Sequence, residues 1–378
     1  GFSYQALNAW KNKAVSNTGV HEGRSAYERD GIHVLDGTAH FINKWQVSVN
    51  NTTYTAKRFL IATGTKSFMP PIPGLKESGC ITYREALELP TLPKSIFIIG
   101  GGAIGCEFAE LYSTLGSKVH IADTAPRLMP NEDKEAGELL AALFDQKGVK
   151  VYSSTEVISV NLNNGKKQVT LRIDSKNYSV IVDEVLVTAG KSPNTDLGLE
   201  NAGVRYTSRG IKTNTYMETT SKNIYAAGDV TGIYMYMHTA VYQSRLAAYN
   251  MFSRKKIRAK YHAIPRCTFV QPEIASVGLT EEQVKNLMIA YQVGAVPISV
   301  VARANTSNQR NGFVKVIASH TGVLLGATIV APRAGEMIHE LAIAINHSMK
   351  AEVISGTVHA FPTWSEAVSI ACQKIHCQ

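Results

Sequence analysis

Three glycines and one aspartate have the types and the spacing of a nucleotide-binding turn. Gly100, Gly102 and Gly105 form the pattern G-x-G-x-x-G directly after the apolar run 96–99. In such a pattern the first glycine permits a tight turn, the second lets the backbone approach a pyrophosphate, and the third lets a helix pack closely on the strand. Asp123 follows Gly105 by eighteen residues, where a carboxylate can accept hydrogen bonds from adenosine ribose hydroxyls. These residues predict a dinucleotide-binding site.

The acid at position 123 also indicates which dinucleotide would bind. A carboxylate at this place repels the 2′-phosphate of NADP(H), so Asp123 favours NAD(H). Arg127 lies four residues further on and could reach a 2′-phosphate, which leaves NADP(H) as the less favoured alternative.

The glycines must be held by a strand, a helix and a second strand, and residues 94–123 predict all three. The helix starts at Ala103, where its N-terminal amides would face the phosphates, and it ends at Gly116. The second strand covers 118–122. Apolar residues at helical spacing predict the face that packs on the sheet, and they are Ile104, Phe108, Leu111 and Leu115.

The composition is that of a folded protein with two or three domains. The chain has 378 residues, of which 44% are hydrophobic and 18% are charged. Its apolar runs are shorter than the roughly 18 residues that cross a bilayer, and no signal-peptide pattern opens it. We therefore expect no membrane segment and a cytoplasmic location.

The cysteines favour reduced thiols over disulfides or metal ligands. They are odd in number and contain no C-x-x-C pair, which argues against a disulfide framework and against a zinc site, so no metal site is predicted. They are Cys80, Cys106, Cys267, Cys372 and Cys377.

The net charge of +9 suits anionic cofactors and substrates. The densest basic run, 254–260, has no aromatic residues interleaved, so a solvated connector is the favoured interpretation. Contact with nucleic acid or acidic lipid is the less favoured one, and we predict neither partner.

Residues 1–30 suit a helix, because Leu7, Trp10, Ala14 and Val15 recur at helical spacing. No capping signal precedes this stretch, so we expect the chain to start inside an element, short of the natural domain start. Alternating segments predict strands at 32–35, 40–42, 45–49 and 52–56. A buried strand then runs from 59 into a glycine turn at Gly64, prolines at 70–73 form a domain exit, and 82–89 is helical.

Beyond the glycine unit, a helix and five strands complete the dinucleotide domain, at 134–147, 149–152, 156–162, 168–173, 178–182 and 184–188. A further buried strand, 224–227, is followed by Gly228 and Asp229. The carboxylate of Asp229 could hold a sugar or ribityl hydroxyl, or it could cap the helix 238–253, and both interpretations stay open.

From 262 onward the pattern changes to antiparallel strands with helices. Strands are predicted at 275–279, 295–302, 312–318 and 322–330, and helices at 281–288, 334–347 and 365–376. This is a separate α+β domain without a glycine-phosphate motif, suited to pairing subunits or shaping a site.

Six motifs in order resemble the class I pyridine nucleotide-disulfide oxidoreductases, the family of dihydrolipoamide dehydrogenase, glutathione reductase and mercuric reductase. They are I-A-T-G (61–64), G-G-G-A-I-G-C-E (100–107), T-A-G-K-S-P-N (188–194), Y-A-A-G-D (225–229), Q-P-E-I-A-S-V-G-L-T-E (271–281) and H-A-F-P-T-W-S-E (359–366). The resemblance implies an α/β fold with Rossmann-like FAD and NAD(P)-binding domains and a C-terminal α+β dimerisation domain. The implied bounds are 1–88 and 213–262 for the FAD domain, 89–212 for the NAD domain and 263–378 for dimerisation.

The resemblance also implies roles for single residues. Thr63 and Gly64 would line the FAD site, and Asp229, with Gly228 before it, would hold the ribityl chain. Glu107 would lie near the flavin where nicotinamide stacks. Gly190 would sit at the nicotinamide end of the cofactor.

The sequence departs from the family in its N-terminal motifs. The family opens with an FAD-binding G-x-G-x-x-G and a redox C-x-x-x-x-C pair, and these 378 residues contain neither. By this analogy we expect the chain to begin about 80 to 90 residues late relative to its relatives, without the adenine and pyrophosphate half of the FAD site.

The second departure is in the acid–base group. The family's acid–base histidine directly precedes Pro-Thr, and that position is Phe361, which cannot exchange a proton. His359 could substitute, although a packing role is favoured, and Glu366, which orients the histidine in relatives, is left as a helix N-terminal acid. Mercuric reductase and soluble transhydrogenase carry tyrosine here, so Phe361 disfavours dihydrolipoamide or glutathione as partner.

Two smaller departures concern the C-terminal cysteines and Lys191. Cys372 and Cys377 are five residues apart, not adjacent as in mercuric reductase, and inert thiols are favoured over a redox or metal role. Lys191 replaces an arginine, which keeps the charge but loses the planar fork.

We therefore predict a homodimeric FAD- and NADH-dependent oxidoreductase that passes hydride from nicotinamide to flavin and on to a small-molecule acceptor, such as a metal ion or a quinone. The acceptor itself is not predicted. One alternative is a dihydrolipoamide dehydrogenase with His359 as a displaced base. The other is a truncated, non-catalytic NAD-binding dimer.

Overall fold

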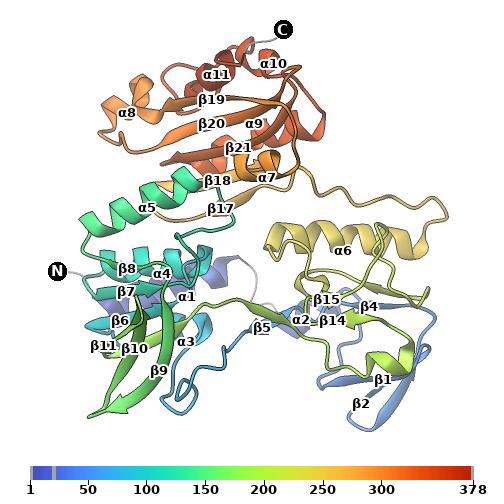
Figure 1. The fold of residues 1–378 in the computed structure, drawn as a ribbon. Helices are drawn as coiled ribbons and strands as arrows, with labels where there is room; N and C mark the ends of the chain where they lie inside the picture. The colour runs from blue at the N-terminus through green and yellow to red at the C-terminus, as the bar shows by residue number, and fades with distance from the viewer. Residues whose placement is uncertain (1–2, 19–22, 376–378) are drawn as a thin grey trace. The chain divides into compact units, whose positions relative to one another are not determined.

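The computed structural model describes residues 3–18 and 23–375, and the chain packs into two compact units. The first unit contains the chain up to Phe68 together with Leu87–Leu92 and Gly190–Lys260. The second contains Met69–Ala86, Pro93–Ala189 and the chain from Tyr261 onward. Each unit is therefore assembled from segments that are far apart in the sequence (Figure 1).

The glycine unit lies in a four-stranded parallel sheet of the second unit. Its strand order is β12-β6-β7-β8, with β6 at Ser95–Ile99, β7 at Lys118–Ala122, β8 at Lys150–Tyr152 and β12 at Glu184–Val187. Strand β6 is central and four of its five residues are buried, as expected for a continuous apolar strand covered on both faces. Three helices alternate with these strands along the chain: α3 (Tyr83–Leu87) before β6, α4 (Ala103–Thr114) between β6 and β7, and α5 (Lys134–Gln146) between β7 and β8.

The face that α4 buries differs from the predicted one. Its buried residues are Gly105, Cys106, Phe108, Ala109 and Tyr112, whereas Leu111 is 40% exposed. The close approach at Gly105 fixes which side of the helix is buried, and Leu111 lies on the exposed side. The prediction of the helix was right, and the prediction of its packing face was wrong at Leu111.

A second, antiparallel layer packs beside the parallel sheet. Strands β9 (Glu156–Asn163), β10 (Lys166–Ile173) and β11 (Lys176–Val182) follow the order β11-β10-β9. Residues Val169 and Leu171 of β10 share one buried cluster with Phe97 of β6 and Val185 of β12. This cluster joins the two sheets.

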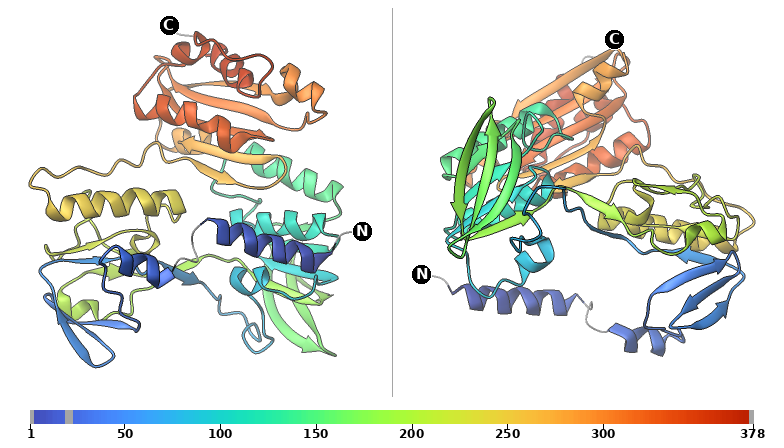
Figure 2. Two further views of the ribbon diagram at one scale, coloured as in Figure 1. Left: turned by 180° about the vertical axis from the view of Figure 1, so that it is seen from behind. Right: turned by 60° about the horizontal axis from the view of Figure 1, so that its bottom comes forward.

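The C-terminal part of the second unit is a five-stranded antiparallel sheet in the order β17-β18-β21-β20-β19. Helix α9 packs against β18 and β21, and α11 against β19 and β20 (Figure 2). The elements are β17 (Arg266–Thr268), β18 (Glu273–Gly278), α7 (Glu281–Asn286), β19 (Tyr291–Pro297), η4 (Ile298–Val300), α8 (Ala302–Thr306), β20 (Phe313–Ser319), β21 (Leu324–Ala331), α9 (Ala334–Asn346), α10 (Ala351–Ser355) and α11 (Glu366–Gln373). The strand predicted at 295–302 lies earlier in the chain, at Tyr291–Pro297, because the chain turns into η4 after Pro297.

The first unit consists of small sheets around one helix. Its longest element is α6 (Met237–Phe252), and its only parallel pair within the described residues is β4 (Phe59–Ile61) with β16 (Ile224–Ala226). The other elements are α1 (Tyr4–Asn17), α2 (Gly23–Arg29), β1 (Ala39–Asn43), β2 (Gln46–Val49), β3 (Thr52–Thr55), β5 (Thr65–Ser67), β13 (Lys191–Pro193), η2 (Leu199–Ala202), β14 (Tyr206–Thr207), β15 (Gly210–Ile211) and η3 (Asp229–Thr231).

The N-terminal stretch differs from its prediction in three ways. Two helices, α1 and α2, stand where one was expected. Helix α1 does have a cap, because the hydroxyl of Ser3 accepts a hydrogen bond from Ala6 N at 3.2 Å. Residues 32–35 form no strand, and Ile32 and Leu35 are exposed because no neighbouring strand pairs with them.

Residues 190–212, which the sequence grouped with the NAD domain, pack in the first unit. Strand β13 pairs with β5, and Phe41 N donates to Leu197 O at 2.7 Å. The chain thus returns to the first unit after Ala189 and not near 212. The division into FAD, NAD and dimerisation domains stays a prediction.

Candidate functional site

The glycine turn between β6 and α4 has a different geometry at each of its three glycines. Gly100 has a φ of +114°, and a Cβ there would lie 2.6 Å from the carbonyl oxygen of Thr188. At Gly105 a Cβ would overlap the carbonyl oxygen of Gly100, so only glycine lets α4 approach β6 this closely. At Gly102 a Cβ would meet no atom within 4 Å. The space beside Gly102, at the N-terminus of a twelve-residue helix, therefore fits a pyrophosphate.

Asp123 follows β7 directly and is tied to the same turn. One carboxylate oxygen accepts a hydrogen bond from Gly101 N at 2.6 Å, and the other accepts one from Ala125 N at 2.7 Å. A carboxylate offers about four acceptor sites, so these two bonds leave capacity for ribose hydroxyls. The sequence predicted the position of Asp123, but not the hydrogen bond by which its carboxylate holds the glycine turn.

The alternative phosphate-binding residue, Arg127, has other partners in the structure. Its guanidinium donates to the carbonyl oxygens of Pro130 and Glu132 and pairs with Glu282 at 3.3 Å. Its side chain is only 20% exposed. These contacts orient it toward α7.

Glu107 lies on α4, one turn beyond Gly102. Its carboxylate accepts a hydrogen bond from Phe269 N at 2.8 Å, and burial raises its pKa despite this bond. Phe269 itself is 68% exposed. The structure thus shows a partly buried acid fixed in position beside an exposed aromatic ring.

The residues predicted to hold FAD come together in the first unit, at the carboxyl ends of β4 and β16. Asp229 pairs with Lys191 at 3.0 Å and lies 3.4 Å from the hydroxyl of Thr65. Thr63 donates through its hydroxyl to Asn194 O at 2.8 Å, and a Cβ at Gly64 would meet no atom within 4 Å. The acid, the glycine turn and the open space fit the ribityl part of a flavin.

The other interpretation of Asp229, as the cap of the following helix, is wrong. Helix α6 begins after Tyr236, and no side chain caps its first turn. Asp229 instead opens the short η3, directly after Gly228, whose φ is +80°. Gly190 lies at the start of the segment that delivers Lys191, with a φ of +123°, and a Cβ there would meet no atom within 4 Å.

The C-terminal motif places Phe361, His359 and Glu366 near the N-terminus of α11. Phe361 is 75% exposed. The carboxylate of Glu366 accepts a hydrogen bond from Thr363 N at 3.0 Å, which is the helix-terminal role expected of it in the absence of a histidine partner.

Both ring nitrogens of His359 face oxygen atoms. Nδ1 lies 2.9 Å from the carbonyl oxygen of Thr357, and Nε2 lies 3.0 Å from a carboxylate oxygen of Glu340. The His359 side chain is only 10% exposed. Burial raises the pKa of Glu340, and the bond to His359 opposes this shift. His359 is therefore a packed residue, and its role as a displaced base stays a prediction.

The cysteines of the described residues are all unpaired thiols. Burial raises the pKa of Cys372 to about 12 and that of Cys80 to about 11, so both remain protonated at neutral pH and are poor nucleophiles. The described residues contain no group of metal-ligating side chains. Cys377, the partner considered for Cys372, lies outside the described residues.

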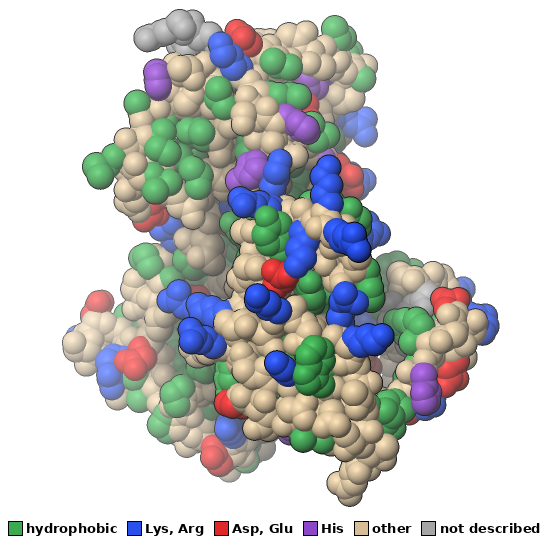
Figure 3. Space-filling view, turned by 90° about the vertical axis from the view of Figure 1, so that its right-hand side faces the viewer, with side chains coloured by type: hydrophobic (Ala, Val, Ile, Leu, Met, Phe, Trp, Pro, Cys, Tyr) green, Lys and Arg blue, Asp and Glu red, His purple; other side chains and the backbone are tan. Residues whose placement is uncertain are grey.

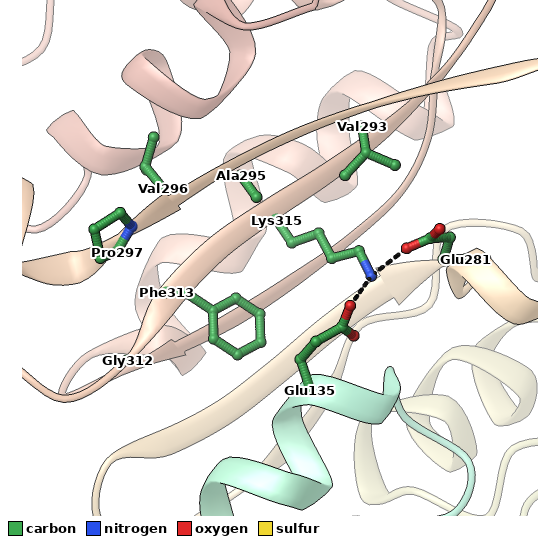
Figure 4. A pocket seen from close by; sticks show the side chains of 9 residues that line it. All are labelled: Glu135, Glu281, Val293, Ala295, Val296, Pro297, Gly312, Phe313 and Lys315. Carbon is green, nitrogen blue, oxygen red and sulfur yellow. Dashed lines mark hydrogen bonds and ion pairs between the residues drawn. The ribbon is translucent and has the colours of Figure 1, made fainter.

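Lys315, which is buried, forms with three acids a cluster that the sequence did not reveal. Lys315 is 4% exposed and pairs with Asp133 at 3.4 Å, Glu135 at 2.9 Å and Glu281 at 2.6 Å. The cluster borders a cavity of about 450 Å³ whose other walls are apolar, and Figure 4 shows Lys315 between Glu135 and Glu281 with Phe313 beside them. These residues join α5 to the C-terminal sheet.

The basic run 254–260 belongs to the first unit, which carries all of the net positive charge of the chain. That unit has 19 Lys and Arg against 9 Asp and Glu, and the second unit has 20 against 21. Figure 3 shows Lys and Arg side chains gathered on one face of the molecule. Within the run, Lys256 pairs with Glu218 and Arg258 donates to the hydroxyl of Tyr216. The run is thus held against its own unit, as expected of a connector.

No helix in the described part of the chain is both long enough and apolar enough to span a membrane.

The parallel sheet with its glycine turn defines a dinucleotide-binding α/β protein. The family model of the pyridine nucleotide-disulphide oxidoreductases matches residues 7–244, and that of their dimerisation domain matches residues 264–372. The chain belongs to the pyridine nucleotide-disulphide oxidoreductase family. The family and the fold class predicted from the six motifs are therefore confirmed.

Relatives with different names are similar to this chain. It is 33% identical to the mercuric reductase of Bacillus cereus over 90% of its own length and 54% of that protein, so it spans about half of this relative. It is 35% identical to the dihydrolipoyl dehydrogenase of Buchnera aphidicola, over 97% of its length and 78% of that protein. Among solved structures, the Cu(II) complex of the HOCl-induced flavoprotein disulfide reductase RclA from Escherichia coli is similar with a TM-score of 0.89 at 27% identity, covering 99% of this chain and 86% of that one.

Proposed function

We propose that the protein is an FAD- and NADH-dependent oxidoreductase that acts as a cytoplasmic homodimer on a small-molecule electron acceptor. Bound FAD would supply the step that takes hydride from nicotinamide and passes electrons on. The chain's own residues would bind and orient: the glycine turn and α4 the dinucleotide, Asp229 and Gly64 the ribityl chain, and the C-terminal domain the second subunit. The family and the free thiols of the described cysteines support this proposal.

NADH is proposed over NADPH because of the charges beside the glycine turn. Asp123 places a carboxylate where a 2′-phosphate would lie, and the guanidinium of Arg127 is engaged by Glu282 and two carbonyl oxygens. A 2′-phosphate beside Asp123 would therefore meet a like charge, and Arg127 would have to give up its present partners to reach it.

The acceptor is proposed to be a metal ion, such as Hg(II), or a quinone, and not a disulfide. The observation that carries this proposal is Phe361, exposed at the position of the acid–base histidine. Disulfide reduction needs a group near that position to take up and return a proton. Phe361 has no such group, and both ring nitrogens of His359 already face the oxygen atoms of Thr357 and Glu340. Reduction of Hg(II) by NADH would give Hg(0), NAD⁺ and one proton released to solvent, so the acceptor itself takes up no proton. The name of one similar protein, a mercuric reductase, favours a metal ion, and the solved structure of RclA, which is named a disulfide reductase, is a complex with Cu(II).

We predict that the flavin-loaded protein oxidises NADH faster with Hg(II) or a quinone than with lipoamide or glutathione disulfide. The variant Phe361→His should raise disulfide turnover by about tenfold or more, because it restores a group that titrates near neutral pH. Steady-state NADH oxidation with each acceptor measures both effects.

Phe361→Tyr is the matched control for this experiment, since it keeps the aromatic ring and adds no group that titrates near pH 7. It should leave disulfide turnover unchanged. A wild-type protein that reduces lipoamide as fast as Hg(II) would instead support the dihydrolipoamide dehydrogenase alternative, which the similarity to dihydrolipoyl dehydrogenase also favours. A protein that binds NADH but oxidises it with no acceptor would support the non-catalytic dimer.

Glu107 gives a second prediction, on hydride transfer. In Glu107→Gln the amide oxygen can still accept the hydrogen bond from Phe269 N, and the cost of a buried charge is removed. Because the raised pKa of Glu107 costs stability once the pH exceeds it, the melting temperature at pH 8 should be unchanged or higher. Flavin reduction by NADH should slow by on the order of tenfold, if the carboxylate acts where nicotinamide stacks. Rapid-mixing absorbance of the flavin gives the rate.

Glu110→Gln, one turn further along α4, is the control. Glu110 pairs with Lys147, and its loss should change stability by under about 1 kcal/mol and leave flavin reduction unchanged. An equal slowing in both variants would remove Glu107 from the site.

A further inference from the structure

The segment between β7 and α5 touches the glycine turn at one end and the C-terminal sheet at the other. We call residues 127–133 the strap. The strap and the residues that it contacts all lie within the second unit. Apart from Arg127, the residue considered for a 2′-phosphate, it contains no residue that the sequence assigned to catalysis or to cofactor binding.

The first half of the strap packs directly on the glycine turn. Met129 N donates a hydrogen bond to Gly101 O at 2.8 Å, and Leu128 lies so close that a Cβ at Gly101 would come within 2.7 Å of its side chain. Leu128 and Met129 are buried, with 1% and 4% exposure. Gly101 is therefore held from two sides, by the strap through its carbonyl oxygen and by Asp123 through its N–H.

The second half of the strap inserts two consecutive acids into the C-terminal sheet. Glu132 pairs through both carboxylate oxygens with Arg266 of β17, at 3.0 and 3.2 Å, and accepts a further hydrogen bond from the hydroxyl of Ser276 on β18. Glu132 is 6% exposed. The bidentate geometry fixes the direction of the carboxylate as well as its distance.

Asp133 makes the second set of contacts. Its carboxylate accepts hydrogen bonds from Thr328 at 2.6 Å and from Glu281 N at 3.0 Å, and it lies 3.4 Å from Lys315. It is 3% exposed. Four side chains and one backbone group, from β17, β18, α7, β20 and β21, thus hold two adjacent residues of the strap.

Two residues of the strap lack the local stabilisation that is usual for their positions. Asp133 is the N-cap of α5, a position where its carboxylate usually accepts a hydrogen bond from the helix, and it makes no such bond here. Met129 has a φ of +52°, a left-handed conformation that is strained for a residue with a side chain. Both exceptions lie between the glycine turn and the C-terminal sheet, and both are what the long-range contacts require.

We infer that the strap, which the C-terminal sheet holds at one end, fixes the position of the glycine turn at its other end. Glu132 and Asp133 are therefore positioning residues for dinucleotide binding. The pyrophosphate is expected beside Gly102, and Gly101 is the residue next to it that the strap holds. Release of the far end of the strap lets Gly101 and the amides that follow it move away from the position that α4 and β6 give them. This inference rests on the proposed function in one respect, the identity of the ligand at the glycine turn.

The test measures the affinity of the full-length protein for NADH and for ADP-ribose by fluorescence and calorimetric titration. Glu132→Gln should weaken the affinity for both ligands by the same factor, about tenfold, because the displaced backbone amides would contact the pyrophosphate that both ligands contain. Ser276→Ala removes one hydrogen bond to Glu132 and leaves the ion pair in place, and it should weaken both by about threefold. Thermal unfolding and sedimentation of each variant report whether it is folded and dimeric.

Glu135→Gln is the matched control. Glu135 contacts Lys315, as Asp133 does, but it lies on α5 beyond the strap and is half exposed. Its removal should leave both affinities within about twofold of the wild type. A purely structural role for Glu132 would lower the melting temperature and leave the affinities unchanged.

The outcomes separate this inference from the proposed function. Wild-type protein that binds neither NADH nor ADP-ribose would overturn the assignment of the glycine turn. Wild-type protein that binds both, with unchanged affinities in Ser276→Ala and in folded Glu132→Gln, would overturn the positioning role alone. If Glu132→Gln does not fold, the Ser276→Ala result decides.

Discussion

Lys315→Met should destabilise the protein strongly, by about 3–5 kcal/mol. Among the described residues, Lys315 is the one cation that pairs with all three of Asp133, Glu135 and Glu281, and Asp133 is 3% exposed. Without it, a buried carboxylate keeps only the hydrogen bonds from Thr328 and Glu281 N and faces two like charges. Urea denaturation of the variant and of the wild type measures the difference in free energy of unfolding.

The same substitution should change how stability depends on pH. Lys285 and Lys315 together hold the pKa of Glu281 at about 2, well below its ordinary value. A carboxyl whose pKa is lowered on folding contributes stability that is present above its unfolded pKa, about 4.3, and is lost as the pH falls toward the folded value. The wild type should therefore lose stability between about pH 4.3 and pH 2, and Lys315→Met should lose less over that range.

Lys285→Met is the control for the magnitude of this effect. Lys285 pairs with the same Glu281, but its side chain is 59% exposed, so its loss should cost much less than the loss of Lys315. Equal costs for the two lysines would show that burial of the cluster does not matter.

Gly105→Ala and Gly102→Ala should separate the structural and the ligand-binding glycines of the turn. A Cβ at Gly105 overlaps the carbonyl oxygen of Gly100, a backbone atom that cannot move without displacing β6, so we expect a loss of about 1–3 kcal/mol of stability and of NADH binding. A Cβ at Gly102 meets no atom within 4 Å, and its φ of −77° suits any residue. Gly102→Ala should therefore melt within about 1 °C of the wild type.

The affinity of Gly102→Ala for NADH is the decisive measurement. If the pyrophosphate lies against this glycine, the added methyl group should weaken NADH at least tenfold, or about 1.4 kcal/mol, in a protein of unchanged stability. Unchanged affinity would place the dinucleotide elsewhere. The proposed site requires weaker NADH binding in both variants, with a loss of stability in Gly105→Ala alone.

The glycine unit could be predicted because its signals are local. A strand, a turn with three glycines, a helix and an acid follow one another within 94–123, and each constrains the next. The packing face of α4 could not be predicted in full, because Leu111 fits helical periodicity as well as Phe108 does. Only the close approach at Gly105 decides which side of the helix faces the sheet.

The strap and the lysine cluster could not be predicted, because their partners are distant in sequence. Asp133 and Lys315 are 182 residues apart, and an acid at a helix start is explained locally by capping. One signal in the sequence could have indicated the lysine cluster. A lysine in an otherwise apolar strand, within F-V-K-V-I-A at 313–318, needs a buried counter-charge, and the candidates were Glu132, Asp133 and Glu135 at the start of α5.

The parallel pair of β4 and β16 has a consequence for how the chain acquires its structure. Ile61 pairs with Ala226, 165 residues later, and the whole parallel sheet of the second unit lies between them in sequence. Closing so long a loop is slow, whereas β6, α4 and β7 are neighbours along the chain. In refolding from urea, amide protons of β6 and β7 should therefore become protected before those of β4 and β16, and an affinity for NADH should return before an affinity for flavin.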